Sequence, residues 1–260
     1  MNGRAISAEL LRVRKSRGLV IWMFIMTVGA VAAFYLIAEG FHLNNAHQNG
    51  PPGGATNLVN GVRVISFIGA VAAAILGCTV GTSDLSSGVF RDLVVTGKSR
   101  VALFGARVPG MLLFWIPLIV LAYAVAVIFD FAFAGSLATP GLSPIVKDGL
   151  WAVMVTSIAL CASMGVAALI GSRGIAIGVL LGWQLAATPL LLNISQLGVT
   201  REAILTSATT RVSPFSGPSG PGGDAATALH VSLFAAVVVL LAWIVVPLAA
   251  GGWRTVTRDA

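Results

Sequence analysis

Six stretches of the chain contain no Asp, Glu, Lys or Arg, and each is 18 to 22 residues long. At ~1.5 Å rise per residue, a helix of that length crosses a hydrocarbon core ~30 Å thick with its backbone hydrogen bonds closed internally. The sequence therefore predicts an all-α polytopic membrane protein with six transmembrane helices. The stretches are Leu19–Ala38, Val64–Gly81, Val108–Phe129, Leu150–Ile170, Gly174–Leu192 and Leu229–Ala250.

The composition excludes a separate soluble domain. Of the 260 residues, 57% are hydrophobic and only 10% are charged, which is too apolar for a soluble domain of this length. We expect one transmembrane domain over residues 1–260, with the charges in the connections.

The basic residues follow membrane topology. With the N-terminus in the cytosol, twelve of the 16 Lys and Arg residues lie on cytosolic segments, and the other four are Arg63, Lys147, Arg201 and Arg211. This bias obeys the positive-inside rule, and an even number of spans returns the C-terminus to the same side. The sequence thus predicts a multi-pass protein of the cell (inner or plasma) membrane with both termini cytosolic. The charges form no single stripe, so a nucleic-acid partner is not expected.

The segment before the first span, residues 4–17, has two interpretations. Ile6, Leu10 and Val13 share one helical face, which favours a short amphipathic helix on the inner leaflet. The alternative is a positively charged flank that only fixes orientation. The basic residues concerned are Arg12, Arg14, Lys15 and Arg17.

The inner connection between spans two and three, residues 82–107, has the pattern of a docking element. Ser83 or Asp84 is suited to cap a helix, and an apolar stripe follows at helical spacing in Leu85, Val89 and Leu93. Asp84, Arg91 and Asp92 leave a charged surface toward the cytosol. We expect a short amphipathic helix at the membrane face.

Two segments of the chain match a known family. One is the basic pre-span segment Glu9-Leu-Leu-Arg-Val-Arg-Lys-Ser-Arg17, and the other is a linker of the form acid, Ser-Gly, Arg, two apolar residues, Gly, Ser-Arg. In both, and in its six spans and long outer connection, the chain resembles the membrane subunits of ATP-binding-cassette exporters of the second permease class. That class includes daunorubicin-type drug, polysaccharide and teichoic-acid exporters. The linker is filled here by Asp84, Ser87-Gly88, Arg91, Leu93-Val94, Gly97 and Ser99-Arg100; the family more often has Glu at its start and Pro near position 97.

The resemblance implies a division of labour between subunits. The linker would contain the coupling helix, which sits in a groove of a cytosolic nucleotide-binding ATPase present in two copies. A second copy of this chain, or a related permease, would complete the translocation path. ATP and Mg would be bound by the ATPase, with no cofactor on this chain. The implied coupling residues are Ser83, Asp84, Leu85, Ser87, Gly88, Arg91 and Asp92.

Local patterns for nucleotide, metal or catalytic sites are weak. Gly97-Lys98-Ser99 lacks the glycine that a phosphate-binding loop needs five residues earlier, because position 92 is Asp. His42 and His47 have no carboxylate or Cys set beside them in the sequence, so no metal site is predicted. No catalytic residues are predicted, and the chain is not expected to be an enzyme.

A glycine ladder and one amide are the candidate path residues. Gly174, Gly178 and Gly182 recur every four residues on the fifth span, a spacing that lets helices approach closely. Intrachain packing, subunit contact and a conduit wall are all compatible with that ladder. Gln184 is the best candidate for a path-lining polar group, since a buried amide is costly to leave unpaired.

The outer connection between spans five and six, residues 193–228, is the longest. Within it, Gln196 to Ala208 is expected to form a short helix at the outer interface, with Ile204 and Leu205 facing lipid.

Two functions remain open at this stage. The first is a permease subunit of an ATP-driven exporter of hydrophobic or amphipathic cargo. It is favoured because ion-coupled carriers usually keep an ionisable group at membrane depth and the six cores have none. The second is a polytopic membrane enzyme or a structural subunit not linked to ATP; its candidate residues, Glu39, His42, Asp130, Asp148 and His230, are scattered over separate loop ends.

Overall fold

A computed structural model describes residues 3–83, 100–217 and 222–257, and all regular secondary structure in these ranges is helical. The predicted all-α fold is confirmed. The elements in chain order are α1 (Gly3–Lys15), α2 (Arg17–Phe24), the π-helical η1 (Ile25–Gly29), α3 (Ala30–Asn44), α4 (Ala55–Gly81), α7 (Arg100–Ala132), α8 (Leu142–Ile170), α9 (Arg173–Gly182), the π-helical η2 (Trp183–Ala187), α10 (Thr188–Asn193), the 3₁₀-helical η3 (Ser195–Ala203), α11 (Leu205–Arg211), α12 (Gly223–Thr227) and α13 (Leu233–Thr257).

Six helical segments among the described residues are long and apolar enough to cross a membrane. They are Arg17–Asn44, Ala55–Gly81, Phe104–Ala132, Leu142–Ile170, Arg173–Asn193 and Leu233–Thr257. Three of them begin four or more residues before the charge-free cores, because polar residues at a membrane boundary do not stop a helix. The extensions bring Arg63, Arg107, Asp130 and Asp148 into spanning segments, near their ends.

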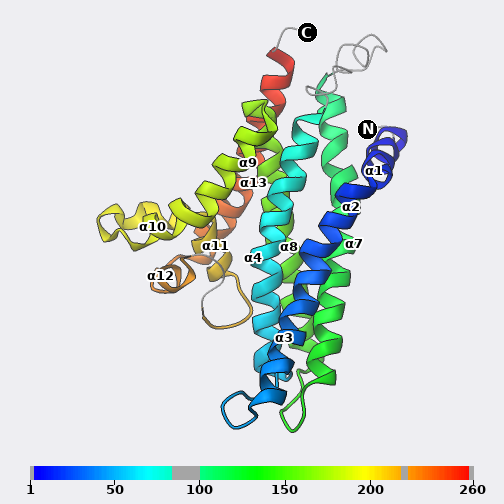
Figure 1. The fold of residues 1–260 in the computed structure, drawn as a ribbon. Coiled ribbons are helices and arrows are strands. Elements are labelled where there is room, and N and C mark those ends of the chain that lie inside the picture. Colours follow the sequence, from blue (N-terminus) through cyan, green and yellow to red (C-terminus); the bar gives the residue numbers. More distant parts are fainter. Residues whose placement is uncertain (1–2, 84–99, 218–221, 258–260) are drawn as a thin grey trace.

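The helices form an elongated bundle with both termini at one end (Figure 1). At the opposite end, the two connections that follow α3 and α7 lie against each other. The Gly53 amide donates to the Phe133 carbonyl oxygen at 3.1 Å, and the Ala55 amide donates to the Ala138 carbonyl oxygen at 2.9 Å. This places α3, α4 and α7 in a fixed register at that end.

Close backbone approach at glycines builds the centre of the bundle. A Cβ on Gly77 of α4 would lie 2.8 Å from Ser163 Cβ of α8, and a Cβ on Gly81 would lie 2.6 Å from the Met164 carbonyl oxygen. On the other face of α8, a Cβ on Gly165 would overlap the backbone of Pro247 in α13. Helix association in lipid depends on such packing, because lipid tails are as apolar as the side chains they replace. We call α4, α8 and α13 the central spine.

The connection after α10 folds back onto the bundle. The α11 segment packs against the middle of α8: the indole nitrogen of Trp151 donates to the Thr209 carbonyl oxygen at 3.0 Å, and Ala208 shares a buried cluster with Ile158. Ile204 is buried with Leu192 and Ala226, so its predicted lipid-facing position is wrong. Irregular backbone at this depth is tolerated only where protein or a polar cavity satisfies it, and here α8 and α13 provide the protein.

Adding one methyl group to the central spine should destabilise the bundle. We expect Gly165→Ala to lower the unfolding free energy by about 3 kcal/mol, because Pro247 contributes backbone at the contact and has no side-chain end to move aside. Gly105→Ala on α7 is the matched control, since a Cβ there meets nothing within 4 Å. Thermal unfolding of the detergent-purified variants measures the difference. Equal melting temperatures for the two variants would contradict the described packing.

Candidate functional site

A cavity of about 650 Å³ opens between the N-terminal helices and the second span. Its walls come from α1, α2, η1 and α4, and Arg173 at the start of α9 closes one side. We call it the α1–α4 cavity. Its volume lies within the ~300–1,000 Å³ range of small-molecule sites.

The α1–α4 cavity has a polar mouth and an apolar interior. Ser83 and Arg173 lie at helix ends on the face of the bundle that carries the termini, whereas Ile75 lies about 12 Å deeper along α4 at ~1.5 Å per residue. The deeper walls are Trp22, Met23, Met26 and Ile75. Methionine and aromatic walls adapt to irregular apolar groups.

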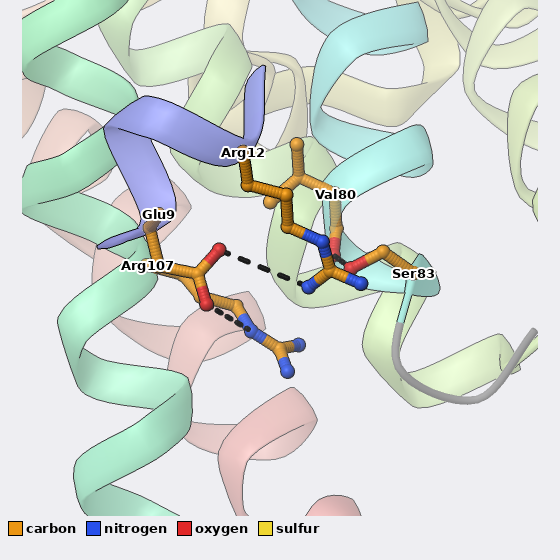
Figure 2. A network of polar contacts seen from close by, with 5 residues as sticks. All are labelled: Glu9, Arg12, Val80, Ser83 and Arg107. Carbon is orange, nitrogen blue, oxygen red and sulfur yellow. Dashed lines mark hydrogen bonds and ion pairs between the residues drawn. The ribbon is translucent and has the colours of Figure 1, made fainter. Parts of the chain in front are cut away.

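Polar contacts border the mouth, and one of them joins α1 to α7 (Figure 2). The Glu9 carboxylate lies 4.0 Å from Arg12 Nη1 and 4.0 Å from Arg107 Nε. Figure 2 shows the Arg12 side chain pointing from α1 toward Ser83, whose hydroxyl donates to the Val80 carbonyl oxygen at 2.9 Å. Arg107 is buried, with a side chain only 4% exposed against 19% for Glu9. The Glu9 carboxylate thus brings an opposite charge from α1 close to the buried Arg107 guanidinium of α7.

Two residues of this group, Ser83 and Arg107, lie on either side of the 84–99 segment in the sequence. Ser83 is the residue before that segment, and α7 begins at Arg100 immediately after it. A force on the 84–99 segment would therefore reach Ser83 on one side and Arg107 on the other. Arg107 lies beside Glu9 of α1, and both Ser83 and α1 line the α1–α4 cavity.

Of the predicted coupling residues, the structure places only Ser83. Asp84, Leu85, Ser87, Gly88, Arg91 and Asp92 lie outside the described residues, so the predicted coupling helix stays a prediction. The helix α7 starts at Arg100, eight residues before the charge-free core, which shortens the connection expected over residues 82–107.

The pre-span segment forms the helix that one of its two interpretations required. The helix packs closely on α7, because a Cβ on Gly110 would lie 3.0 Å from Glu9 Cβ and 3.3 Å from the Ile6 carbonyl oxygen, and Val13 is buried. Ser16 ends α1 with its hydroxyl donating to the Val13 carbonyl oxygen at 2.7 Å. Arg12 lines the α1–α4 cavity and Arg14 lines a separate shallow groove; Lys15 and Arg17 are exposed beside the helix junction.

The glycine ladder of α9 faces open space within this chain. A Cβ on Gly174, Gly178 or Gly182 meets no atom within 4 Å, in contrast to Gly77 and Gly81 on α4. Among the described residues the ladder thus makes no helix contact. Gln184 lies in η2 and lines a second cavity of about 90 Å³ together with Ser66, Ser163, Thr188, Thr206 and Thr209.

Asp130 is a buried acid that the charge-free cores did not include. It lies near the end of α7, it is 0% exposed, and neither carboxylate oxygen has a hydrogen-bond partner among the described residues. Asp148 is also buried, near the start of α8. No group of three or more His, Cys, Asp or Glu residues suited to hold a metal ion occurs in the described part of the chain.

The sequence matches no model of a known protein family, and no curated protein matches it significantly. The relation to exporter permeases therefore remains the resemblance carried by the pre-span segment and the linker.

Removing the charge of Glu9 should loosen α1. We expect Glu9→Gln to accelerate hydrogen exchange of the α1 backbone about tenfold, because the buried Arg107 guanidinium loses its carboxylate at a cost of about 1–3 kcal/mol. Arg14→Gln, which removes an exposed charge from the same helix, should leave the exchange unchanged. Unaltered exchange in Glu9→Gln would show that this pair does not hold the helix.

Neutralising Asp130 should stabilise the protein. A neutral amide costs less to bury than a carboxylate, so we expect Asp130→Asn to raise the melting temperature by about 2–4 °C for each ~1 kcal/mol gained. The exposed Asp224→Asn serves as control. A lower melting temperature for Asp130→Asn would reveal a stabilising partner for the carboxylate.

Proposed function

We propose that this chain is the permease subunit of an ATP-driven exporter in the cell membrane, with both termini and the 84–99 segment in the cytosol. Two permease copies, or this chain and a related one, form the translocation path. Two cytosolic ATPase subunits dock on residues 83–93, and their hydrolysis of ATP drives the opening of the path. The cargo is hydrophobic or amphipathic.

The observation that carries this proposal is the Glu9–Arg107 ion pair. Arg107 lies in the first turns of α7, the helix that follows the 84–99 segment. A coupling segment is useful only if its displacement reaches the cavity that holds cargo. Here Arg107 of α7, the helix that follows the segment, lies beside Glu9 of α1, and α1 is a wall of the α1–α4 cavity. Movement of the segment would therefore change the width of the α1–α4 cavity.

The buried acids bear on the energy source. Asp130 and Asp148 lie near the ends of their spans, where the connections after α3 and α7 meet, and neither lines the α1–α4 cavity. An ion-coupled carrier needs its ionisable group on the cargo path. The position of Asp130 and Asp148 away from the α1–α4 cavity therefore favours ATP hydrolysis by a partner subunit as the energy source.

The test is ATP-dependent efflux from vesicles that contain the chain and its ATPase. Asp84→Ala and Arg91→Ala should each lower ATP-dependent efflux about tenfold or more, since each removes a charge from the proposed docking face. Arg254→Ala, an exposed cation near the C-terminus, is the control and should leave efflux unchanged.

A membrane pull-down with the wild-type chain should also retain a soluble protein with a phosphate-binding loop, and the Asp84 and Arg91 variants should retain less of it. Unchanged efflux and unchanged retention in both variants would contradict the proposal.

A further inference from the structure

The second cavity, of about 90 Å³, lies at membrane depth between the fifth span and the central spine. Gln184 on its wall is eleven residues from Arg173 and nine from Asn193, so it stands near the middle of that span. Trp183 lines the same cavity and is 36% exposed, so the cavity adjoins the side of the bundle. The described residues that line it include no charged side chain.

The chain itself pairs many of the polar groups around this cavity. Three hydroxyls each donate at 2.6–3.1 Å to a carbonyl oxygen three or four residues earlier, those of Ser66, Ser163 and Thr209. The indole nitrogens of Trp151 and Trp243 donate to the carbonyl oxygens of Thr209 and Ala203, both at 3.0 Å. These groups therefore need no ligand, and the two indoles are held in place.

Gln184 and Thr188 lack such partners. Thr188 is only 4% exposed, and its hydroxyl forms no hydrogen bond with a described residue. Helical threonines elsewhere in the bundle donate to the carbonyl oxygen four residues earlier, as Thr27 and Thr156 do. At Thr188 the helix is π-helical, and its backbone amide donates to the Trp183 carbonyl oxygen five residues earlier. The Gln184 amide also has no hydrogen-bond partner within the described ranges, which is costly where water is excluded.

The free groups and the walls define the chemistry of a ligand. The Gln184 amide and the Thr188 hydroxyl can both donate a hydrogen bond, so an acceptor oxygen can pair with both. The walls are rich in aromatic side chains, and the ring centroids of Trp183 and Trp243 lie 6.0 Å apart. Such walls favour a flat ring. The cavity is smaller than the ~150 Å³ that holds a whole benzene, so it accepts only one end of a larger molecule.

We propose that the second cavity binds an uncharged, lipid-soluble molecule that carries a carbonyl group on a flat ring. The carbonyl oxygen accepts hydrogen bonds from Gln184 and Thr188, and the ring lies against Trp183 and Trp243. The rest of the molecule lies in lipid. A charged ligand would find no opposite charge in the described walls, and a hydrocarbon would leave the amide unpaired. This site rests on its own geometry and does not depend on the proposed export function.

Photolabelling of the full chain in lipid nanodiscs tests the site. The probe is para-decylbenzophenone, an uncharged aryl ketone that attaches to neighbouring C–H bonds on irradiation. We expect saturable labelling of the peptides that line the second cavity, located by mass spectrometry. Labelling spread evenly over the lipid-facing helices, or labelling that does not saturate, would mean that only water or bulk lipid occupies the cavity and would overturn the proposal.

Two competitors isolate the role of the carbonyl. Decanophenone carries the carbonyl next to its ring, and decylbenzene has a methylene group in the same place. At equal mole fractions in the lipid, the ketone should displace the probe about tenfold more effectively, because only the ketone accepts hydrogen bonds. Equal displacement by the two compounds would refute recognition of an acceptor oxygen.

Matched variants separate free from paired polar groups. Gln184→Leu with Thr188→Val should lower labelling of the cavity about tenfold and leave the melting temperature of the free protein undiminished, since neither group is paired with a described residue. Ser163→Ala removes a hydroxyl of the same cavity that is already bonded to the Ala159 carbonyl oxygen, and it should preserve labelling. Equal labelling in the two proteins, or a large fall in the melting temperature of the double variant, would overturn the proposal.

Discussion

Close backbone contact between α4, α8 and α13 is the constraint on which the rest of the structure depends. Lipid offers no hydrophobic gain for helix association, so the spine exists only where glycine lets backbones meet. Gly77, Gly81 and Gly165 supply those contacts. Because α8 is enclosed by its neighbours, the remaining helices attach at the periphery. The first span, the fifth span and α13 itself stay largely exposed, and the α1–α4 cavity opens between the first span and α4.

The periphery is where the molecule departs from regular helix. The first and fifth spans each contain a π-helical segment, Ile25–Gly29 and Trp183–Ala187. In the first, the Thr27 hydroxyl donates to the Met23 carbonyl oxygen at 2.7 Å and competes with the backbone for that acceptor. Such segments are frequent at functional sites. Here one supplies Met26 to the α1–α4 cavity, and the other supplies Gln184 to the smaller cavity.

The charge-free runs predicted the six spans because burial in lipid imposes a constraint that each segment meets by itself. The same runs missed the span ends, where Asn57, Asn60 and Arg63 continue α4 by bonding to loops and to one another. They also missed α11, since seven residues rich in Ser and Thr have no membrane pattern. Its depth follows from the long-range contact of Trp151 with Thr209. Glu9 and Arg107 were separate charges in the sequence; only tertiary packing pairs them, and only it brings Arg173 to the cavity.

We propose that the free energy of ATP hydrolysis by a partner subunit reaches this helical bundle through the 84–99 segment. Benzoylphenylalanine introduced at Phe90 and irradiated in intact cells tests it most directly, with the cross-linked product identified by mass spectrometry. We expect a covalent product with a soluble nucleotide-binding subunit. Products formed only with lipid, or with a protein outside the cell, would contradict it.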